Sequence, residues 1–439
     1  MLSDKTVIEL PYSTSFIKIK VPSKNLAFVL ERKKTSTIDN EEAAIREALN
    51  SPVGSPALCK CLNSTDKVVI LVTDNTRACP DKRLLPVILE EVESRVPGEN
   101  ITIIVALGLH PPLDSTALVQ KLGRRIIADY RVINHDFNQT NNIGTTSRGN
   151  PVEIYREVAE ADFILSTGFI EPHFFAGFSG GRKSIAPGVS SRRAICQNHS
   201  YKMIDDERAR AGVLQGNPVH EDMVEQAKLA GLNFIVNVLL NKKGQITHVV
   251  AGDPVLAHEK GCRLEKNIAT ARISHEVDIT IITNGGAPLD MDLYQTCKAI
   301  DTASQITRKG GIIIAVSRCN SGVGPEAFYR LHALSGSPQG VLERIQREEP
   351  IGVQWQNQIL ARSQLKNRVL LVSSLRPEEV RGMMLQPVST VEEGIAAAVS
   401  TLGKEAEIAI IPEGPYVLPF TAKHEQNTAN QEQNESGNE

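Results

Sequence analysis

Four histidines stand in loop-like contexts that could carry chemistry. His110 lies in Ala-Leu-Gly-Leu-His-Pro-Pro, His173 in Glu-Pro-His, His199 in Gln-Asn-His-Ser and His135 in Asn-His-Asp. Two imidazoles on opposite faces of a substrate could act as a paired acid and base, and a third could bind a borderline metal. A single loop histidine is more often a hydrogen-bonded structural residue, so these residues alone leave the roles open.

The Gly-rich segment of residues 168–188 is the densest signal in the chain. Glycines let the backbone approach a ligand and expose its N–H groups, so Gly180 and Gly181 are candidates for binding a cofactor beside Lys183. A P-loop requires glycine directly before its lysine, and Arg182 stands there, which argues against a nucleoside triphosphate site. For Gly-Gly-Arg-Lys alone, a turn with a solvated lysine is the default interpretation.

Two cations are candidates for binding an anionic substrate. Arg77 could form a bidentate fork with a carboxylate, and Lys298 could act as a compact charge, although either one alone is more often a surface cation. The sequence has no His-Glu-x-x-His motif and no Cys/His cluster with zinc spacing, which argues against a zinc hydrolase. It also has no G-x-G-x-x-G after an early strand, which argues against an NAD-dependent dehydrogenase.

The chemical residues follow short apolar runs that read as strands. Runs such as 68–72, 101–105 and 163–165 alternate with amphipathic stretches at 84–92 and 115–122, which predicts βαβ units with a buried parallel sheet. Asp74 and Arg77 follow the first of these strands, His110 the second and His173 the third. Parallel sheets bind ligands at the carboxyl ends of their strands, so these loops are expected to converge on one site.

We expect two α/β domains with mainly parallel sheets and an active site at the domain interface. The first domain is predicted over residues 1–272, rejoined by 404–420, with strands at 16–21 and 26–30 near its start. The second is predicted over 273–403, with strands at 277–282, 311–316 and 369–372 and a helix at 291–307. The polar tail, 421–439, is expected to be disordered.

Composition excludes several partner classes. The 439 residues carry a net charge of −3 and only 4% aromatics, which argues against a nucleic-acid or membrane-surface protein. The N-terminus lacks the pattern of a secretory signal, and no apolar run is long enough to span a membrane. Seven scattered cysteines without a C-x-x-C pair fit reduced thiols, so we expect a cytoplasmic protein.

Taken together, these residues resemble the nickel-dependent lactate racemase family. The matching pieces are Asp74-x-Thr-Arg77, Ala106-Leu-Gly-x-His110, Pro172-His173, Ala176 to Lys183, Pro187-Gly188, His199, Tyr294-Gln295 with Lys298, and Trp355, the single tryptophan. The resemblance runs from about residue 10 to 418. It implies an isomerase, a racemase or epimerase of 2-hydroxy acids.

Members of that family carry a nickel pincer nucleotide, a pyridinium-3-thioamide-5-thiocarboxylic acid mononucleotide tethered through its thioamide to a lysine. The resemblance implies that Lys183 carries this cofactor and that His199 binds the Ni(II), beside the ring carbon and the two sulfurs. It also implies that His110 and His173 act as acid and base. Asp74 would contact the cofactor or orient Arg77, and the sequence does not separate these roles.

The same resemblance assigns the substrate contacts. Arg77 and Lys298 would hold the substrate carboxylate, while Tyr294, Gln295 and Trp355 would shape the pocket. The hydrogen on the carbinol carbon is barely acidic, so we expect it to leave as hydride to the cofactor while a base takes the hydroxyl proton. The planar keto acid that forms can receive hydride on its other face.

Lactate is the first substrate expected, and accessory enzymes are expected to make the cofactor. Two alternatives keep the fold but differ in the substrate or in catalytic activity. One is a racemase or epimerase of malate, a longer-chain 2-hydroxy acid or a sugar acid. Another is a catalytically inactive nucleotide- or metal-binding homologue. A homodimer is compatible with either reading.

Overall fold

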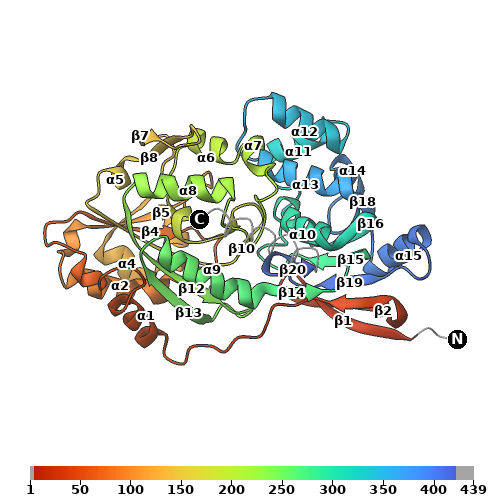
Figure 1. Ribbon diagram of the computed structural model, residues 1–439, viewed down its shortest axis with the longest axis horizontal. Coiled ribbons are helices and arrows are strands. Elements are labelled where there is room, and N and C mark those ends of the chain that lie inside the picture. The colour runs from red at the N-terminus through yellow and green to blue at the C-terminus, as the bar shows by residue number, and fades with distance from the viewer. Residues whose placement is uncertain (1–3, 422–439) are drawn as a thin grey trace, which may run out of the picture. The chain divides into compact units, whose positions relative to one another are not determined.

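The chain divides into two units, each built around its own sheet (Figure 1). The computed structural model describes residues 4–421. Unit 1 lies within Met1–Lys33 and Ala269–Glu439, and unit 2 is Lys34–Ile268. Apart from Thr421, the predicted disordered tail lies outside the described residues. No helix among those residues is long and apolar enough to cross a membrane.

Unit 2 alternates strands and helices along the chain. Its strands are β4 (Val68–Thr73), β5 (Ile101–Ala106), β6 (Arg131–Asn134), β7 (Thr140–Thr145), β8 (Pro151–Tyr155), β9 (Phe163–Phe169), β10 (Pro172–His173), β11 (Gly177–Phe178), β12 (Leu232–Leu240) and β13 (Ile246–Gly252). Its α-helices are α1 (Glu41–Asn50), α2 (Asp81–Glu93), α3 (Ser115–Leu122), α4 (Arg124–Asp129), α5 (Arg156–Ala159), α6 (Arg192–Asn198), α7 (Tyr201–Ile204), α8 (Pro218–Leu229) and α9 (Leu256–Ala269). Its 3-10 turns are η2 (Leu58–Lys60), η3 (Gly98–Asn100) and η4 (Gly181–Ser184).

The main sheet of unit 2 has the order β13-β12-β9-β4-β5-β6, and only β13 pairs antiparallel. Helices cover both faces. Along β4, Val68, Ile70 and Val72 pack in a core with α1 and α2, whereas Val69 and Leu71 pack in a core with α8 and α9. A strand buried on both faces must be apolar at every position, which explains the continuous run in the sequence.

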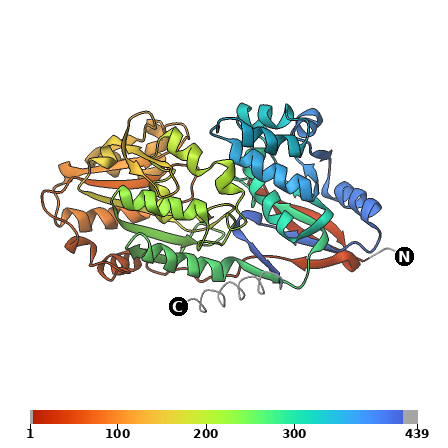
Figure 2. The same ribbon diagram turned by 45° about the horizontal axis from the view of Figure 1, so that its top comes forward.

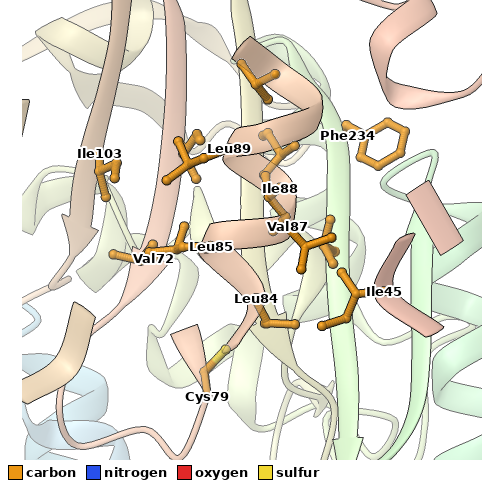
Figure 3. Packing of buried hydrophobic residues seen from close by; sticks show 14 of the residues in the cluster. Ile45, Val72, Cys79, Leu84, Leu85, Val87, Ile88, Leu89, Ile103 and Phe234 are labelled. Atoms are coloured by element: carbon orange, nitrogen blue, oxygen red, sulfur yellow. The ribbon is translucent and has the colours of Figure 1, made fainter. Parts of the chain in front are cut away.

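Helix α2 shows how densely that first core packs. Its buried face includes Leu84, Leu85 and Ile88, which belong to one core cluster with Ile45, Val72 and Ile103 (Figure 3). Burying each of these aliphatic side chains contributes about 1.5–3 kcal/mol. The packing fixes the strand ends from which the polar loops of the site leave.

Unit 1 is a second α/β layer structure, whose helices are the teal and blue ones in the second view (Figure 2). Its strands are β1 (Lys5–Tyr12), β2 (Ser15–Pro22), β3 (Leu26–Val29), β14 (Thr270–Ile273), β15 (Val277–Thr283), β16 (Thr307–Val316), β17 (Arg368–Val372), β18 (Gln386–Val388), β19 (Ile408–Ile411) and β20 (Leu418–Thr421). Its helices are α10 (Leu293–Ile306), α11 (Glu326–Ala333), α12 (Pro338–Arg347), α13 (Gln354–Lys366), α14 (Pro377–Gly382) and α15 (Val391–Leu402), with 3-10 turns η1 (Ser23–Asn25) and η5 (Gly414–Tyr416).

The main sheet of unit 1 has the order β18-β17-β16-β15-β19-β3, with all neighbours parallel. One face is covered by α10, α11 and α13. The other is covered by α15 and by the hairpin β1–β2, whose Leu10, Ile19 and Val21 are buried there. The predicted α/β class with mainly parallel sheets is therefore confirmed.

The division into units differs from the predicted ranges at the two ends of the chain. The first strands belong to unit 1, because β3 pairs with β19 and the hairpin β1–β2 buries its apolar side chains on the same sheet. For the same reason, β19 stays in unit 1 and does not rejoin the first domain. The other boundary, between Ile268 and Ala269, lies close to the predicted one.

A buried ion pair anchors the loop that follows β4. Lys121 of α3 lies 2.8 Å from Asp81 of α2, and the two side chains are 7% and 0% exposed. The Lys121 ammonium also donates to Thr73 Oγ1 and to the carbonyls of Arg77 and Cys79, at 3.0, 3.2 and 3.1 Å. One cation thus fixes both ends of the segment that carries Asp74 and Arg77.

Replacing Lys121 by Met should destabilise the protein by about 3–5 kcal/mol, because the Asp81 carboxylate would be left buried without its cation. Urea unfolding followed by circular dichroism measures the change. The double variant Asp81→Asn/Lys121→Met removes both charges and keeps an acceptor for Thr167, so it should regain part of the loss. A single variant as stable as the wild type would contradict this account of the loop.

Candidate active site

A carboxylate–imidazole pair stands at the carboxyl ends of β4 and β5. The Nδ1 atom of His110 lies 2.8 Å from Oδ2 of Asp74. The Asp74 side chain is buried, whereas 38% of the His110 side chain is exposed. A carboxylate can only accept, so His110 donates from Nδ1 and presents the lone pair of Nε2.

Neighbouring donors keep the Asp74 carboxyl ionised. Its Oδ1 atom accepts from the Thr76 N–H at 2.6 Å and from Thr76 Oγ1 at 2.5 Å. Burial alone would raise the pKa of Asp74, but the hydrogen bond from His110 and the charge of Arg77 outweigh it and hold that pKa well below its usual value. Asp74 therefore contacts His110 directly and also lies in the field of Arg77.

His173 is held in a different way. It lies in the two-residue strand β10, and its Nδ1 accepts the backbone N–H of Ala176 at 3.2 Å. Its ring packs edge-on against Phe175, with centroids 4.6 Å apart. An Nδ1 that accepts a hydrogen bond leaves the proton of the neutral ring on Nε2, so His173 presents an N–H where His110 presents a lone pair.

His199 follows the last residue of α6 and is 5% exposed. The Phe175 ring also contacts His199, with ring centroids 4.9 Å apart, so one phenyl ring packs against both His173 and His199. Burial lowers the pKa of His199 well below its usual value, and the charge of Lys183 lowers it further. The imidazole is therefore neutral, the form that binds metals.

The turn before Lys183 is fixed from its inner side. Arg182 is 2% exposed, and its guanidinium donates to the carbonyls of Ala176 and Gly180 and lies 2.9 Å from His258 Nε2. Lys183 itself is half-buried.

The two glycines of this turn have a packing reason of their own. A Cβ on Gly181 would come within 2.8 Å of the His258 ring, and one on Gly180 within 2.6 Å of Asn237 Oδ1. The φ angle is +53° at Gly181 and +78° at Gly180, in a region that residues other than glycine rarely adopt. Their assignment to cofactor binding stays a prediction.

The His110 loop is bonded to the Gly-rich segment. The N–H of Gly108 donates to the carbonyl of Gly188 at 2.9 Å. Gly188 in turn donates to the carbonyl of Lys183 at 3.1 Å. Unit 2 therefore brings the predicted residues Asp74, Arg77, His110, His173, Lys183 and His199 to loops that leave the carboxyl ends of β4, β5 and β9 or pack on those loops.

The other predicted site residues lie in unit 1. Tyr294, Gln295 and Lys298 occupy the first turns of α10, where Asp292 caps the helix by accepting the Gln295 N–H at 2.7 Å. Residues four apart share a helix face, so Tyr294 and Lys298 lie on one side. Trp355 belongs to α13, which packs against α10.

His135, the fourth histidine of the sequence, is buried with its ring 5.5 Å from that of Tyr155, and burial lowers its pKa to about 4. Sequence reasoning included Thr76 in the motif Asp74-x-Thr-Arg77 but gave it no role, although Asp-x-Thr is a common turn pattern that could have suggested one. It also missed the Asp81–Lys121 ion pair under the loop after β4, and His258 of α9, which lies beside Arg182.

The described residues contain no group of three or more His, Cys, Asp or Glu side chains that could hold a metal ion. All seven cysteines lie in this part of the chain, and none forms a disulfide. A single buried imidazole such as His199 could complete the coordination of a metal whose other donors came from a bound group.

Comparison with known proteins identifies the family. The lactate racemase N-terminal domain matches residues 12–212, and the lactate racemase C-terminal domain matches residues 273–418. A lactate racemase of Thermoanaerobacterium thermosaccharolyticum is 36% identical over 420 residues, which cover 94% of this chain and 98% of that protein. A lactate racemase of Lactiplantibacillus plantarum is 36% identical over 421 residues, covering 94% and 99%.

Solved structures agree with the sequence matches. The lactate racemase apoprotein from Thermoanaerobacterium thermosaccharolyticum superposes with a TM-score of 0.91 at 35% identity, over 94% of this chain and all of that one. A Thermotoga maritima protein at 18% identity and a TM-score of 0.66, over 88% of this chain and all of that one, shares the fold. The chain therefore belongs to the lactate racemase family and is a racemase, an isomerase.

Proposed function

We propose that this racemase interconverts the enantiomers of a 2-hydroxy acid, with lactate as the substrate. The observation that carries the proposal is the Asp74–His110 pair, bonded through Gly108 and Gly188 to the segment that carries Lys183. The named substrate of both relatives supports lactate over malate, longer acids and sugar acids. A cytoplasmic location and accessory enzymes for cofactor synthesis belong to the same proposal.

The residues present fit a nickel pincer nucleotide tethered to Lys183. The neutral, buried imidazole of His199 offers one nitrogen donor, and the charge of Lys183 is near enough to lower the pKa of that imidazole. A lone histidine suits a metal whose remaining donors belong to the nucleotide. When bound, the cofactor would accept hydride from the carbinol carbon and return it.

The chain itself would handle the hydroxyl proton. His110 presents a lone pair on Nε2 and can take that proton, since the Asp74 carboxylate stabilises the imidazolium that forms. His173 presents Nε2–H and can donate to the oxygen of a keto acid. We therefore propose that Asp74 acts through His110, in addition to the contact with the cofactor or with Arg77 that the sequence suggests.

Arg77 and Lys298 would bind the substrate carboxylate and hold the keto acid between the two half-reactions. Gln295 contributes an amide oxygen that is buried and has no hydrogen-bond partner among the described residues, so it can accept a bond from the substrate. Tyr294 and Trp355 would line the pocket with aromatic surface.

The tether predicts a covalent adduct on one lysine. Protein purified with its cofactor-synthesis enzymes should exceed the chain mass by one cofactor, and peptide mapping should locate the adduct on Lys183. Lys183→Ala should lose both the adduct and the activity, whereas Lys202→Ala, which changes an exposed lysine of α7, should keep both. Active protein with unmodified Lys183 would rule out the tether.

Asp74→Asn should lower kcat by about 10²- to 10⁴-fold, because an amide no longer stabilises the imidazolium of His110. Intact mass checks that the variant still carries the adduct. If Asp74 acts through His110, the same change in a His110→Asn background should cause little further loss. Equal losses in both backgrounds would assign Asp74 another role.

Hydride transfer predicts that the carbon-bound hydrogen stays with the substrate. Single-enantiomer lactate deuterated at carbon 2 should therefore racemise in ordinary water while keeping its deuterium, measured by polarimetry and mass spectrometry. Loss of the label at the rate of racemisation would indicate proton abstraction instead. Racemisation of malate or a sugar acid but not lactate would support the alternative substrates, and no reaction at all would support an inactive homologue.

A further inference from the structure

The buried carboxylate of Asp222, on α8, accepts four hydrogen bonds and lies outside the site described so far. Its exposure is 0%. Oδ1 accepts from Thr146 Oγ1 at 2.7 Å and Asn150 Nδ2 at 3.0 Å, and Oδ2 accepts from Asn198 Nδ2 and Gln226 Nε2, both at 2.7 Å. No Lys or Arg of the described residues forms an ion pair with Asp222 within 4.0 Å.

One of these donors is the residue directly before His199. Asn198 ends α6, and its amide also donates to the carbonyl of Val219 on α8 at 3.3 Å. The N–H of His199 bonds to the carbonyl of Ile195, so the histidine continues the helical path. The end of α6 is thus tied to α8 at two points, one residue before the predicted metal ligand.

The tie matters because α6 has only seven residues. A helix this short is unstable by itself, so its position depends on tertiary contacts. The turn between β7 and β8 orients the carboxylate of Asp222 through Thr146 and Asn150, which both bond to Oδ1. Oδ2 is then aimed at Asn198, and the orientation passes along this chain to the backbone of His199.

We propose that Asp222, acting through Asn198, is a positioning residue that holds His199 in place for binding nickel. This inference rests on the proposed function, because it assumes a metal at His199. Residues that orient a metal ligand raise metal affinity without touching the metal, typically by about 10- to 100-fold.

The test is nickel retention by cofactor-loaded protein. Asp222→Asn keeps the size of the side chain but turns one acceptor into a donor, which faces the amide NH2 groups of Asn198 and Gln226 in one orientation and that of Asn150 in the other. The loaded variant should keep its Lys183 adduct but lose nickel to a chelator about 10- to 100-fold faster than the wild type. Intact mass reports the adduct, and elemental analysis after timed chelator treatment reports the nickel.

Glu225→Gln is the matched control. Glu225 lies on the same helix and accepts from Ser147 N and Oγ, at 2.7 and 2.8 Å, in the same turn, but it is not bonded to Asn198. It should lose nickel at the wild-type rate. A general loosening of the contact between α8 and the turn would instead affect both variants alike and would overturn the inference.

Asn198→Ser removes the amide that bonds Asp222 and the carbonyl of Val219 but keeps Asp222 and its other bonds, so it decides the question if Asp222→Asn does not fold. It should also speed nickel loss, and wild-type retention in every folded variant would overturn the proposal. Wild-type protein with neither adduct nor nickel would overturn the proposed function, and this inference with it. Adduct and nickel in the wild type, with no effect of the variants, would overturn this inference alone.

Discussion

The buried guanidinium of Arg182 is the constraint on which the arrangement of the site depends. A charge at 2% exposure is tolerated only where acceptors surround it, and the carbonyls of Ala176 and Gly180 supply them. Burial lowers its pKa to about 10, so it remains charged at neutral pH. These bonds tie the guanidinium to the backbone on both sides of the turn that carries Lys183.

Buried polar side chains also hold the other loops of the site in place. Loops lack the regular hydrogen bonds of strands and helices, so their backbone groups need partners from side chains. Lys121 supplies them under the segment after β4, and Asp222 supplies acceptors near the end of α6. Apolar packing fixes the strands, whereas buried polar side chains fix the loops between them.

This difference explains what the sequence could predict. Apolar runs such as 68–72 and 101–105 mark strands directly, and the residues after them lie at the strand ends by topology, so six of the predicted site residues fall in loops around that edge of the sheet. The pairing of β3 with β19 joins residues far apart in sequence, and no local pattern records it. The sequence also did not identify Lys121 or Asp222, because each is a single polar residue on an amphipathic helix and its partners lie elsewhere in the chain.

The two histidines are held unequally, although a racemase converts mirror-image substrates. The Nδ1 atom of His110 lies against the Asp74 carboxylate, whereas the Nδ1 atom of His173 accepts the backbone N–H of Ala176. Under the proposed function, each turnover leaves one more proton on His110 and one fewer on His173, and the starting state returns when the two rings exchange protons with water. The equilibrium constant between enantiomers is one, so kcat/KM must be equal in the two directions. The different environments of His110 and His173 can therefore make kcat and KM differ between the two directions only by the same factor.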